Sequence, residues 1–197
     1  MSWMLVLLWV SLAFLSGSLP FSVWIARLAG ADPRSVGDRN PGATNALKAA
    51  GKGAGLAALL LDVSKAAAPV GLAYQAFGLR GPAMAAIAIA PMLGHAYSPF
   101  LGFKGGKALA TALGVWIGLT WWDVPLVILV NITVWFLLLR KSGQAVLLTL
   151  VAVAVYLIVR RPEALFFWIL GLQAGLVLWK HRHDLATEIF HSPPQKS

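Results

Sequence analysis

The sequence contains no cysteine and few charged residues. Only 12% of its 197 residues are Asp, Glu, Lys or Arg, whereas 59% are hydrophobic. The absence of cysteine excludes disulfide bonds, cysteine-ligated zinc sites and thiol nucleophiles. So few charged side chains cannot cover the surface of a water-soluble domain. The composition therefore predicts a protein whose main solvent is lipid.

Long polar segments are also missing, so no separate soluble domain is expected. A helix needs about 20 apolar residues to cross a bilayer core about 30 Å thick. The apolar runs lack the period-2 alternation of transmembrane β-strands, which excludes a barrel. We predict a single all-α, polytopic membrane domain over residues 1–197, a bundle of about seven transmembrane helices. The runs lie near residues 3–26, 54–77, 82–101, 108–122, 124–139, 144–159 and 164–179.

Two features support this division into spans. The first run has neither the basic start nor the cleavage site of a secretory signal, so we expect it to be retained. Residues 108–139 are too many for one crossing, and Trp121, Trp122 and Pro125 mark an interfacial turn between two spans.

Basic residues divide unevenly between the two sides of such a bundle. One side receives only Arg80, Arg160 and Arg161, and Lys65 lies within a span. By the positive-inside rule the N-terminus then faces outward and the C-terminus faces the cytoplasm. The cytoplasmic segments include loops at about 27–53 and 102–107 and a tail at 180–197. The basic residues on this side are Arg27, Arg34, Arg39, Lys48, Lys52, Lys104, Lys107, Arg140, Lys141, Lys180, Arg182 and Lys196.

The net charge of +9 has two interpretations at this stage. The cations are not arranged as a nucleic-acid-binding stripe, and no groove-reading helix is present, so no nucleic acid partner is expected. They can simply orient the protein and contact anionic lipid headgroups. Alternatively, the three cytoplasmic segments converge at the membrane surface and form a site.

The first loop is rich in glycine, asparagine and threonine. It contains Asn40-Pro41-Gly42-Ala43-Thr44-Asn45, followed by Lys48. Glycine lets a ligand approach the main chain, and Asn and Thr supply neutral hydrogen-bonding groups. A simple connector rarely needs this composition, although loops of turn formers do occur by chance.

The second segment contains Lys104-Gly105-Gly106-Lys107, a turn expected to open a helix. Free N–H groups at a helix start and two flanking ammonium groups can hold a phosphate. The spacing of a Walker A loop is missing. The turn alone is a weak signal.

The third segment, Lys180-His181-Arg182-His183-Asp184, follows the last span. Residues two apart on a helix do not face the same way, and His181 and His183 have no evident further ligands, so we predict no metal site.

Polar residues inside the spans are expected to be mainly structural. Asp62 and Lys65 are three apart on one helix face and can neutralise each other, although charges at membrane depth often mark function. His95 and Asn131 are expected to form hydrogen bonds between helices.

Together these segments resemble the bacterial membrane glycerol-3-phosphate acyltransferases that use acyl phosphate as donor. The resemblance spans nearly the whole chain. Its ordered matches are Gly17-Ser18-Leu19-Pro20, Ile25-Ala26-Arg27, Gly37, Asn40-Pro41-Gly42-Ala43-Thr44-Asn45, Gly51-Lys52-Gly53, Asp62, Lys65, Gly94-His95, Pro99, Phe100-Leu101-Gly102-Phe103-Lys104-Gly105-Gly106-Lys107, Ala110-Thr111-Ala112-Leu113-Gly114 and His181-Arg182.

The resemblance implies a seven-helix enzyme of phospholipid synthesis in the bacterial cell membrane. It would acylate the sn-1 hydroxyl of glycerol 3-phosphate, releasing lysophosphatidic acid and phosphate, without metal, acyl coenzyme A or other cofactor. Its partners would be acyl phosphate, glycerol 3-phosphate, membrane lipids and an upstream enzyme that forms acyl phosphate. The implied catalytic residues are His181, Asp184, Asp38 and Lys107. The implied substrate- and phosphate-binding residues are Arg39, Asn40, Gly42, Thr44, Asn45, Lys48, Lys104, Gly105, Gly106 and Arg182.

Four positions depart from the family pattern. Asp38 replaces the serine of Gly-Ser-Gly-Asn, and its charge would repel phosphate unless a cation such as Arg39 pairs with it. Lys48 replaces an arginine and loses the bidentate grip on phosphate. Ala108 replaces a glycine after the Lys-Gly-Gly-Lys turn, and Asp184 replaces an asparagine and cannot donate.

These departures leave two functional hypotheses. The chain is a working acyltransferase with a rearranged site, or it is a catalytically impaired paralogue that binds lipid or phosphate as a scaffold. Only turnover distinguishes them. The proton of the attacking hydroxyl could pass to His181 or to the donor's own phosphate.

Overall fold

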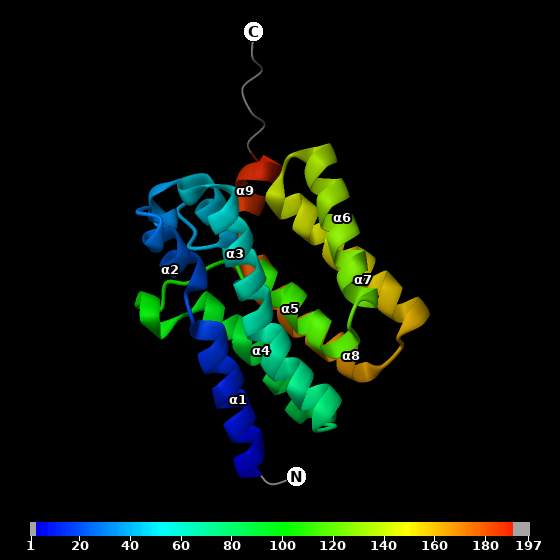
Figure 1. Cartoon of the computed structure of the whole chain (residues 1–197). Coiled ribbons are helices and arrows are strands. Elements are labelled where there is room, and N and C mark those ends of the chain that lie inside the picture. Colours follow the sequence, from blue (N-terminus) through cyan, green and yellow to red (C-terminus); the bar gives the residue numbers. More distant parts are fainter. Residues whose placement is uncertain (1–2, 191–197) are drawn as a thin grey trace. The chain divides into compact units, whose positions relative to one another are not determined.

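The computed structural model describes residues 3–190 and consists of helices connected by short loops (Figure 1). The predicted all-α class is confirmed. The chain forms two compact units, residues 1–121 and 122–197. Lys196, assigned above to the cytoplasmic side, lies outside the described residues.

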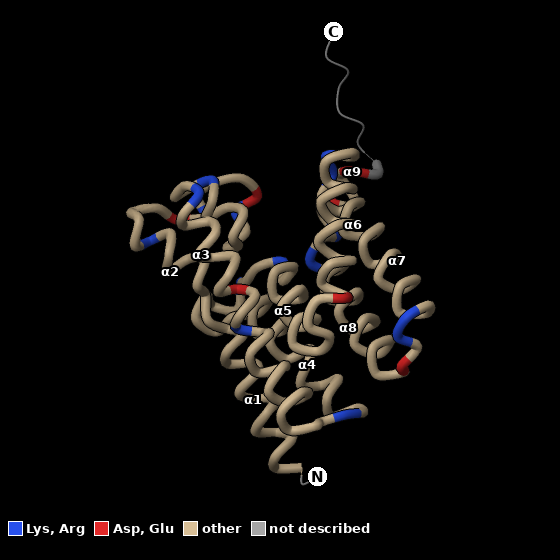
Figure 2. The backbone as a smooth tube through the Cα atoms, turned by 45° about the vertical axis from the view of Figure 1, so that its right-hand side comes forward, with Lys and Arg blue, Asp and Glu red and all other residues tan. Residues whose placement is uncertain are grey.

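The described part of the first unit contains five α-helices and three short helical turns. Lys and Arg gather around α2 and the first turns of α3, whereas α1 carries no charge (Figure 2). The elements are α1 (Trp3–Ser18), α2 (Phe21–Leu28), η1 (Pro33–Ser35), α3 (Ala43–Gly71), η2 (Leu72–Ala76), α4 (Gly81–Ala96), η3 (Pro99–Leu101) and α5 (Leu109–Thr120).

Close helix contacts in this unit occur at small residues. A Cβ atom added to Gly17 of α1 would lie 2.1 Å from the carbonyl oxygen of Pro91 in α4. A Cβ at Gly114 of α5 would lie 2.1 Å from the carbonyl oxygen of Val63 in α3. Apolar side chains gain no hydrophobic free energy by moving from lipid to a helix interface, so helices associate through such close backbone packing. Glycine therefore fixes the α1–α4 and α3–α5 pairs.

Helix α3 begins earlier than the sequence indicated. It starts at Ala43, not near residue 54, and bends at Gly51, whose φ of 86° and ψ of 178° are not helical. Glycine reaches this positive φ without a Cβ clash. The segment predicted as a continuous loop to residue 53 is therefore partly helical, and Thr44 and Asn45 lie in the first turn of α3.

The second unit contains α6 (Asp123–Leu139), α7 (Ser142–Arg160), α8 (Ala164–Lys180) and α9 (Arg182–Phe190). Arg161, just after α7, pairs with Asp123 at the start of α6 at 2.7 Å, which aligns α6 and α7 as an antiparallel pair. The segment predicted as a tail from residue 180 is helical through α9, because the Glu188 carboxylate accepts hydrogen bonds from the N–H groups of Gly143 and Gln144 and docks this helix on α7.

Asn131 does not bond between helices as predicted. Its side-chain amide donates to the carbonyl oxygen of Val127, one turn earlier in α6. A local acceptor within hydrogen-bond reach satisfies the amide without a partner helix.

All seven predicted apolar runs coincide with helices. Within residues 3–190, four helical segments are long and apolar enough to cross a membrane: Trp3–Leu28, Ala43–Ala76, Gly81–Leu101 and Ser142–Arg160. A fifth arises if Ala164–Lys180 and Arg182–Glu188, bent by 65°, count as one span, and Leu109–Thr120 and Asp123–Leu139 are shorter. A multi-pass membrane fold follows, while the count of seven crossings and the orientation stay predictions.

The Gly114 contact yields a test of the α3–α5 packing. Gly114→Ala should lower the thermal unfolding midpoint in detergent, because the added methyl meets the α3 backbone and overpacking costs about 1–3 kcal/mol. Gly53→Ala is the matched control, since no atom lies within 4 Å of its added Cβ. Equal midpoints for the two variants would contradict the proposed role of close backbone contact.

Candidate functional site

The first polar loop is organised by the buried side chain of Asn45. Its amide donates to Asp38 Oδ1 at 2.8 Å and to the carbonyl oxygen of Asn40 at 3.0 Å. Gly37 has a φ of 57°, and a Cβ there would lie 2.7 Å from Asn45 Oδ1 and 3.2 Å from Lys48 Nζ. The loop therefore curls around Asn45, and Lys48 lies against its turn.

The Lys-Gly-Gly-Lys segment leads into α5 as predicted, but its glycines are already hydrogen-bonded. The N–H groups of Gly105 and Gly106 donate to the carbonyl oxygens of Ala96 and His95, at 3.2 and 3.1 Å. The glycines therefore do not supply the free N–H groups predicted for the helix start, because the carbonyls at the end of α4 need donors. The first N–H groups of α5, like those of any α-helix, have no acceptor within the helix.

Glycine is required at both positions of this turn. A Cβ on Gly105 would lie 1.9 Å from the carbonyl oxygen of His95, and one on Gly106 would lie 2.3 Å from His95 Nε2. Ala108 precedes α5 with a φ of 62°. The glycine that the family pattern has at this position fits that left-handed conformation without a Cβ penalty.

An ion pair joins the first two segments. Lys107 Nζ lies 2.7 Å from Asp38 Oδ2. Burial alone would raise the pKa of Asp38, but hydrogen bonds from Lys107 and Asn45 outweigh it and hold that pKa below its usual value. Lys107, and not Arg39 as the sequence suggested, neutralises Asp38. Arg39 has an exposed side chain and a φ of 59°.

The candidate site in the first unit is open to solvent. Lys48 and Lys104 are exposed, Lys107 retains 21% of its side-chain exposure, and Thr44 is exposed at the start of α3. Gly42, just before that helix, is buried. Lys48 and Lys107 thus converge on the turn at residues 37–38, where an anion could reach them.

The third segment lies in the second unit, at the junction of α8 and α9. His181 is 2% exposed, and its Nδ1 lies 2.9 Å from the carbonyl oxygen of Val177. A carbonyl only accepts, so Nδ1 carries a proton and Nε2 is the acceptor in the neutral ring. Arg182 donates to the carbonyl oxygen of Trp179 and stacks on its ring, and Asp184 faces Ser142 across 3.5 Å.

Asp62 and Lys65 pair as predicted, and His95 joins them. Lys65 Nζ lies 2.7 Å from Asp62 Oδ1 and 2.9 Å from His95 Nδ1, and all three residues are buried. His95 thus links α4 to α3, as its isolation in an apolar span indicated. No residue spacing in the sequence indicated that His95 contacts Gly106.

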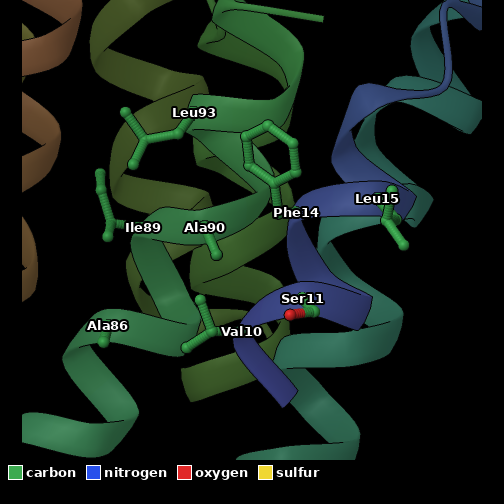
Figure 3. A pocket seen from close by; sticks show the side chains of 8 residues that line it. All are labelled: Val10, Ser11, Phe14, Leu15, Ala86, Ile89, Ala90 and Leu93. Carbon is green, nitrogen blue, oxygen red and sulfur yellow. The ribbon is translucent and has the colours of Figure 1, made fainter. Parts of the chain in front are cut away.

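An apolar groove runs between α1 and α4 in the first unit, with a volume of about 550 Å³. Phe14 and Leu93 lie at one end, and Val10 and Ala86 lie at the other (Figure 3). Leu93 is two residues before His95, whose carbonyl holds the Lys-Gly-Gly-Lys turn. In residues 3–190, no group of three or more acidic or histidine side chains is placed to hold a metal.

Comparison with known proteins gives one family. The sequence model of the family described as glycerol-3-phosphate acyltransferase matches residues 7–190. A glycerol-3-phosphate acyltransferase of Desulfovibrio desulfuricans is 37% identical over 185 residues, which cover 92% of this chain and 81% of the relative. One of Pseudomonas aeruginosa is 38% identical over 189 residues and covers 94% of both chains.

Solved structures agree with the sequence comparison. The crystal structure of PlsY (YgiH), an integral membrane glycerol 3-phosphate acyltransferase, in its glycerol 3-phosphate form has a TM-score of 0.85 at 33% identity and covers 92% of this chain and 90% of that one. The lysophosphatidic acid form of PlsY has a TM-score of 0.82 at 31% identity, with the same coverage.

The Asp38–Lys107 pair predicts how the first unit binds anions. Asp38→Asn should tighten binding of inorganic phosphate up to about fivefold, because Lys107 is freed and a repelling charge is lost, while the amide oxygen still accepts from Asn45. Asp32→Asn is the matched control, since hydrogen bonds from Arg34 lower the pKa of Asp32 to about 2 in a separate exposed pair. Calorimetry that finds unchanged or weaker phosphate binding in Asp38→Asn alone would contradict this.

Proposed function

Because the chain belongs to the glycerol-3-phosphate acyltransferase family and is an acyltransferase, we propose that it transfers an acyl group from acyl phosphate to the sn-1 hydroxyl of glycerol 3-phosphate. The products are lysophosphatidic acid and inorganic phosphate. The observation that carries this proposal is the 2.7 Å contact of Lys107 with Asp38, which joins the first loop to the Lys-Gly-Gly-Lys turn. PlsY, which is similar along most of its length, has forms with glycerol 3-phosphate and with lysophosphatidic acid.

We assign phosphate binding to the lysines of the two segments that this contact joins. Two phosphorylated substrates bring about three to four negative charges, which need several cations and N–H donors at close range. Lys48, Lys104 and Lys107 supply three ammonium groups, and the first turn of α5 supplies N–H groups at the positive end of its dipole. A substrate phosphate then takes the place of Asp38 beside Lys107, and Asp38 turns to the exposed Arg39 or to solvent.

The remaining residues of the site have supporting roles. Asn40, Gly42, Thr44 and Asn45 form and hold the loop around the bound phosphate. Gly105 and Gly106 allow their turn to pack against α4. In the second unit, Arg182 stays a proposed substrate-binding residue and Asp184, which faces Ser142, stays a proposed catalytic residue.

The chemistry needs positioning more than activation. In an acyl phosphate the carbonyl carbon is attacked by the sn-1 hydroxyl oxygen, the new ester bond forms, and the bond from that carbon to the phosphate oxygen breaks. Phosphate is a stable leaving group, so no covalent enzyme intermediate is needed. The hydroxyl proton goes either to His181, whose Nε2 is the acceptor in the neutral tautomer, or to the departing phosphate.

We further propose the membrane arrangement that this reaction needs. The chain crosses a bacterial plasma membrane seven times as one functional domain, with its N-terminus outside and its three polar segments on the cytoplasmic face. There it can receive acyl phosphate from an enzyme that forms it. The α1–α4 groove holds the acyl chain, because its Leu93 end lies next to the turn that binds the phosphate.

The first test is phosphate release by purified protein in nanodiscs. Acyl phosphate should yield phosphate only when glycerol 3-phosphate is present, and Lys107→Ala should reduce this release at least about tenfold, because a charge-assisted contact to phosphate is lost. Lys52→Ala is the matched control, an exposed lysine after the bend in α3. Folded protein that binds phosphate but releases none from acyl phosphate would overturn the proposed reaction and leave the scaffold hypothesis.

The groove predicts chain-length selection. Ala86→Trp fills the end of the groove far from the phosphate turn, so kcat/KM should fall for long acyl chains and stay nearly constant for short ones. Leu60→Trp, an exposed position of α3 outside the groove, is the control. An equal loss for all chain lengths would place the acyl chain elsewhere.

A further inference from the structure

A buried polar network lies behind the Lys-Gly-Gly-Lys turn and has no part in the chemistry described above. Lys65 Nζ donates to the carbonyl oxygen of Leu19 at 2.8 Å, to Asp62 Oδ1 at 2.7 Å and to His95 Nδ1 at 2.9 Å. Ser22 Oγ donates to the other oxygen of Asp62. Three acceptors around one ammonium group use all three of its N–H bonds. The direction of the Lys65 side chain is therefore fixed.

The orientation of the His95 ring follows from this contact. An ammonium group only donates, so Nδ1 must accept, and the proton of the neutral ring is on Nε2. The Nε2 edge faces Gly106, since a Cβ added there would lie 2.3 Å from Nε2. The carbonyl oxygen of His95 accepts from the N–H of Gly106 at 3.1 Å. His95 thus supports the turn with both its ring and its backbone.

We propose that Lys65 and His95 are positioning residues for the anion site, an inference that rests on the function proposed for that site. Lys65, oriented by Asp62, holds the imidazole ring in one tautomer and one rotamer. The ring edge and carbonyl then hold Gly106, and through it Lys107, at the distance that lets Lys107 meet an anion beside residue 38. Substrate affinity thereby depends on groups that do not touch substrate.

Substitutions at the two ends of the network distinguish a positioning role from a packing role. Ser22 bonds to Asp62 between α2 and α3, away from the turn, whereas His95 contacts the turn itself. If the network only held helices together, loss of either end would affect stability and leave phosphate binding unchanged. If it positions the turn, loss of the His95 end weakens phosphate binding, whereas loss of the Ser22 end does not.

The experiment compares His95→Asn with Ser22→Ala in the full chain. The Asn side chain offers Lys65 an acceptor near the Nδ1 position but has no ring edge to support Gly106. We expect the dissociation constant of inorganic phosphate and the KM for glycerol 3-phosphate to rise roughly tenfold in His95→Asn, with a smaller change in kcat. Ser22→Ala should lower the thermal midpoint with both constants unchanged.

His95→Gln provides the conservative rescue. Its amide reaches the position of Nε2, so it should recover part of the phosphate affinity that His95→Asn loses. If His95→Asn does not fold, the comparison of His95→Gln with Gly106→Ala replaces it, because the second variant disturbs the same contact from the turn. Combining Gly106→Ala with a His95 substitution should cost less than the sum of the two, since the clash is removed only once.

Unchanged phosphate affinity in folded His95→Asn or His95→Gln would overturn the proposal. Phosphate binding is measured without turnover, so this failure is distinct from failure of the proposed reaction. Wild-type protein that binds phosphate but transfers no acyl group would refute the reaction and still test the positioning role. Wild-type protein that binds no phosphate would overturn both.

Discussion

A single buried ammonium group connects the elements that carry the proposed anion site. Lys65 of α3 contacts the connection between α1 and α2 at Leu19, its own helix at Asp62, and α4 at His95. A charge at membrane depth is costly unless it is paired and fully hydrogen-bonded. That requirement confines the three segments to one arrangement. Because His95 lies in the last turn of α4 and its carbonyl oxygen accepts from Gly106, the burial of one charge is coupled to the geometry of the Lys-Gly-Gly-Lys turn.

Close backbone packing supplies the rest of the frame. In lipid, apolar side chains gain little by meeting each other, so contact distance and dispersion decide which helices pair. Gly17 brings α1 against α4, and Gly114 brings α5 against α3. Since α4 ends and α5 begins on either side of the Lys-Gly-Gly-Lys turn, these two contacts fix both ends of that turn. Small residues within the helices thus set the position of the two lysines of this turn.

The sequence predicted the helical segments and the main motifs well, because apolar length and basic loops follow directly from the bilayer. It placed the start of α3 too late, since the bend at Gly51 and the helix at residues 43–50 depend on local hydrogen bonds in a polar segment. It assigned Arg39 as the partner of Asp38, because neighbours in sequence are the natural candidates. Lys107 takes that place through a fold that joins distant loops. The support of Gly106 by His95 likewise arises only in three dimensions.

The replacement of the family's serine by Asp38 is compatible with the fold because two features absorb its charge. Asn45 binds one carboxylate oxygen and Lys107 binds the other, so the aspartate is held in the loop that the family pattern builds around a hydroxyl. An exposed ion pair of this kind is weak, of order 1 kcal/mol or less, whereas a phosphate dianion attracts the same lysine more strongly. Exchange of Lys107 from carboxylate to substrate therefore requires little free energy. In the function proposed above, Asp38 is a resident counter-ion that occupies the cationic turn until a substrate phosphate displaces it.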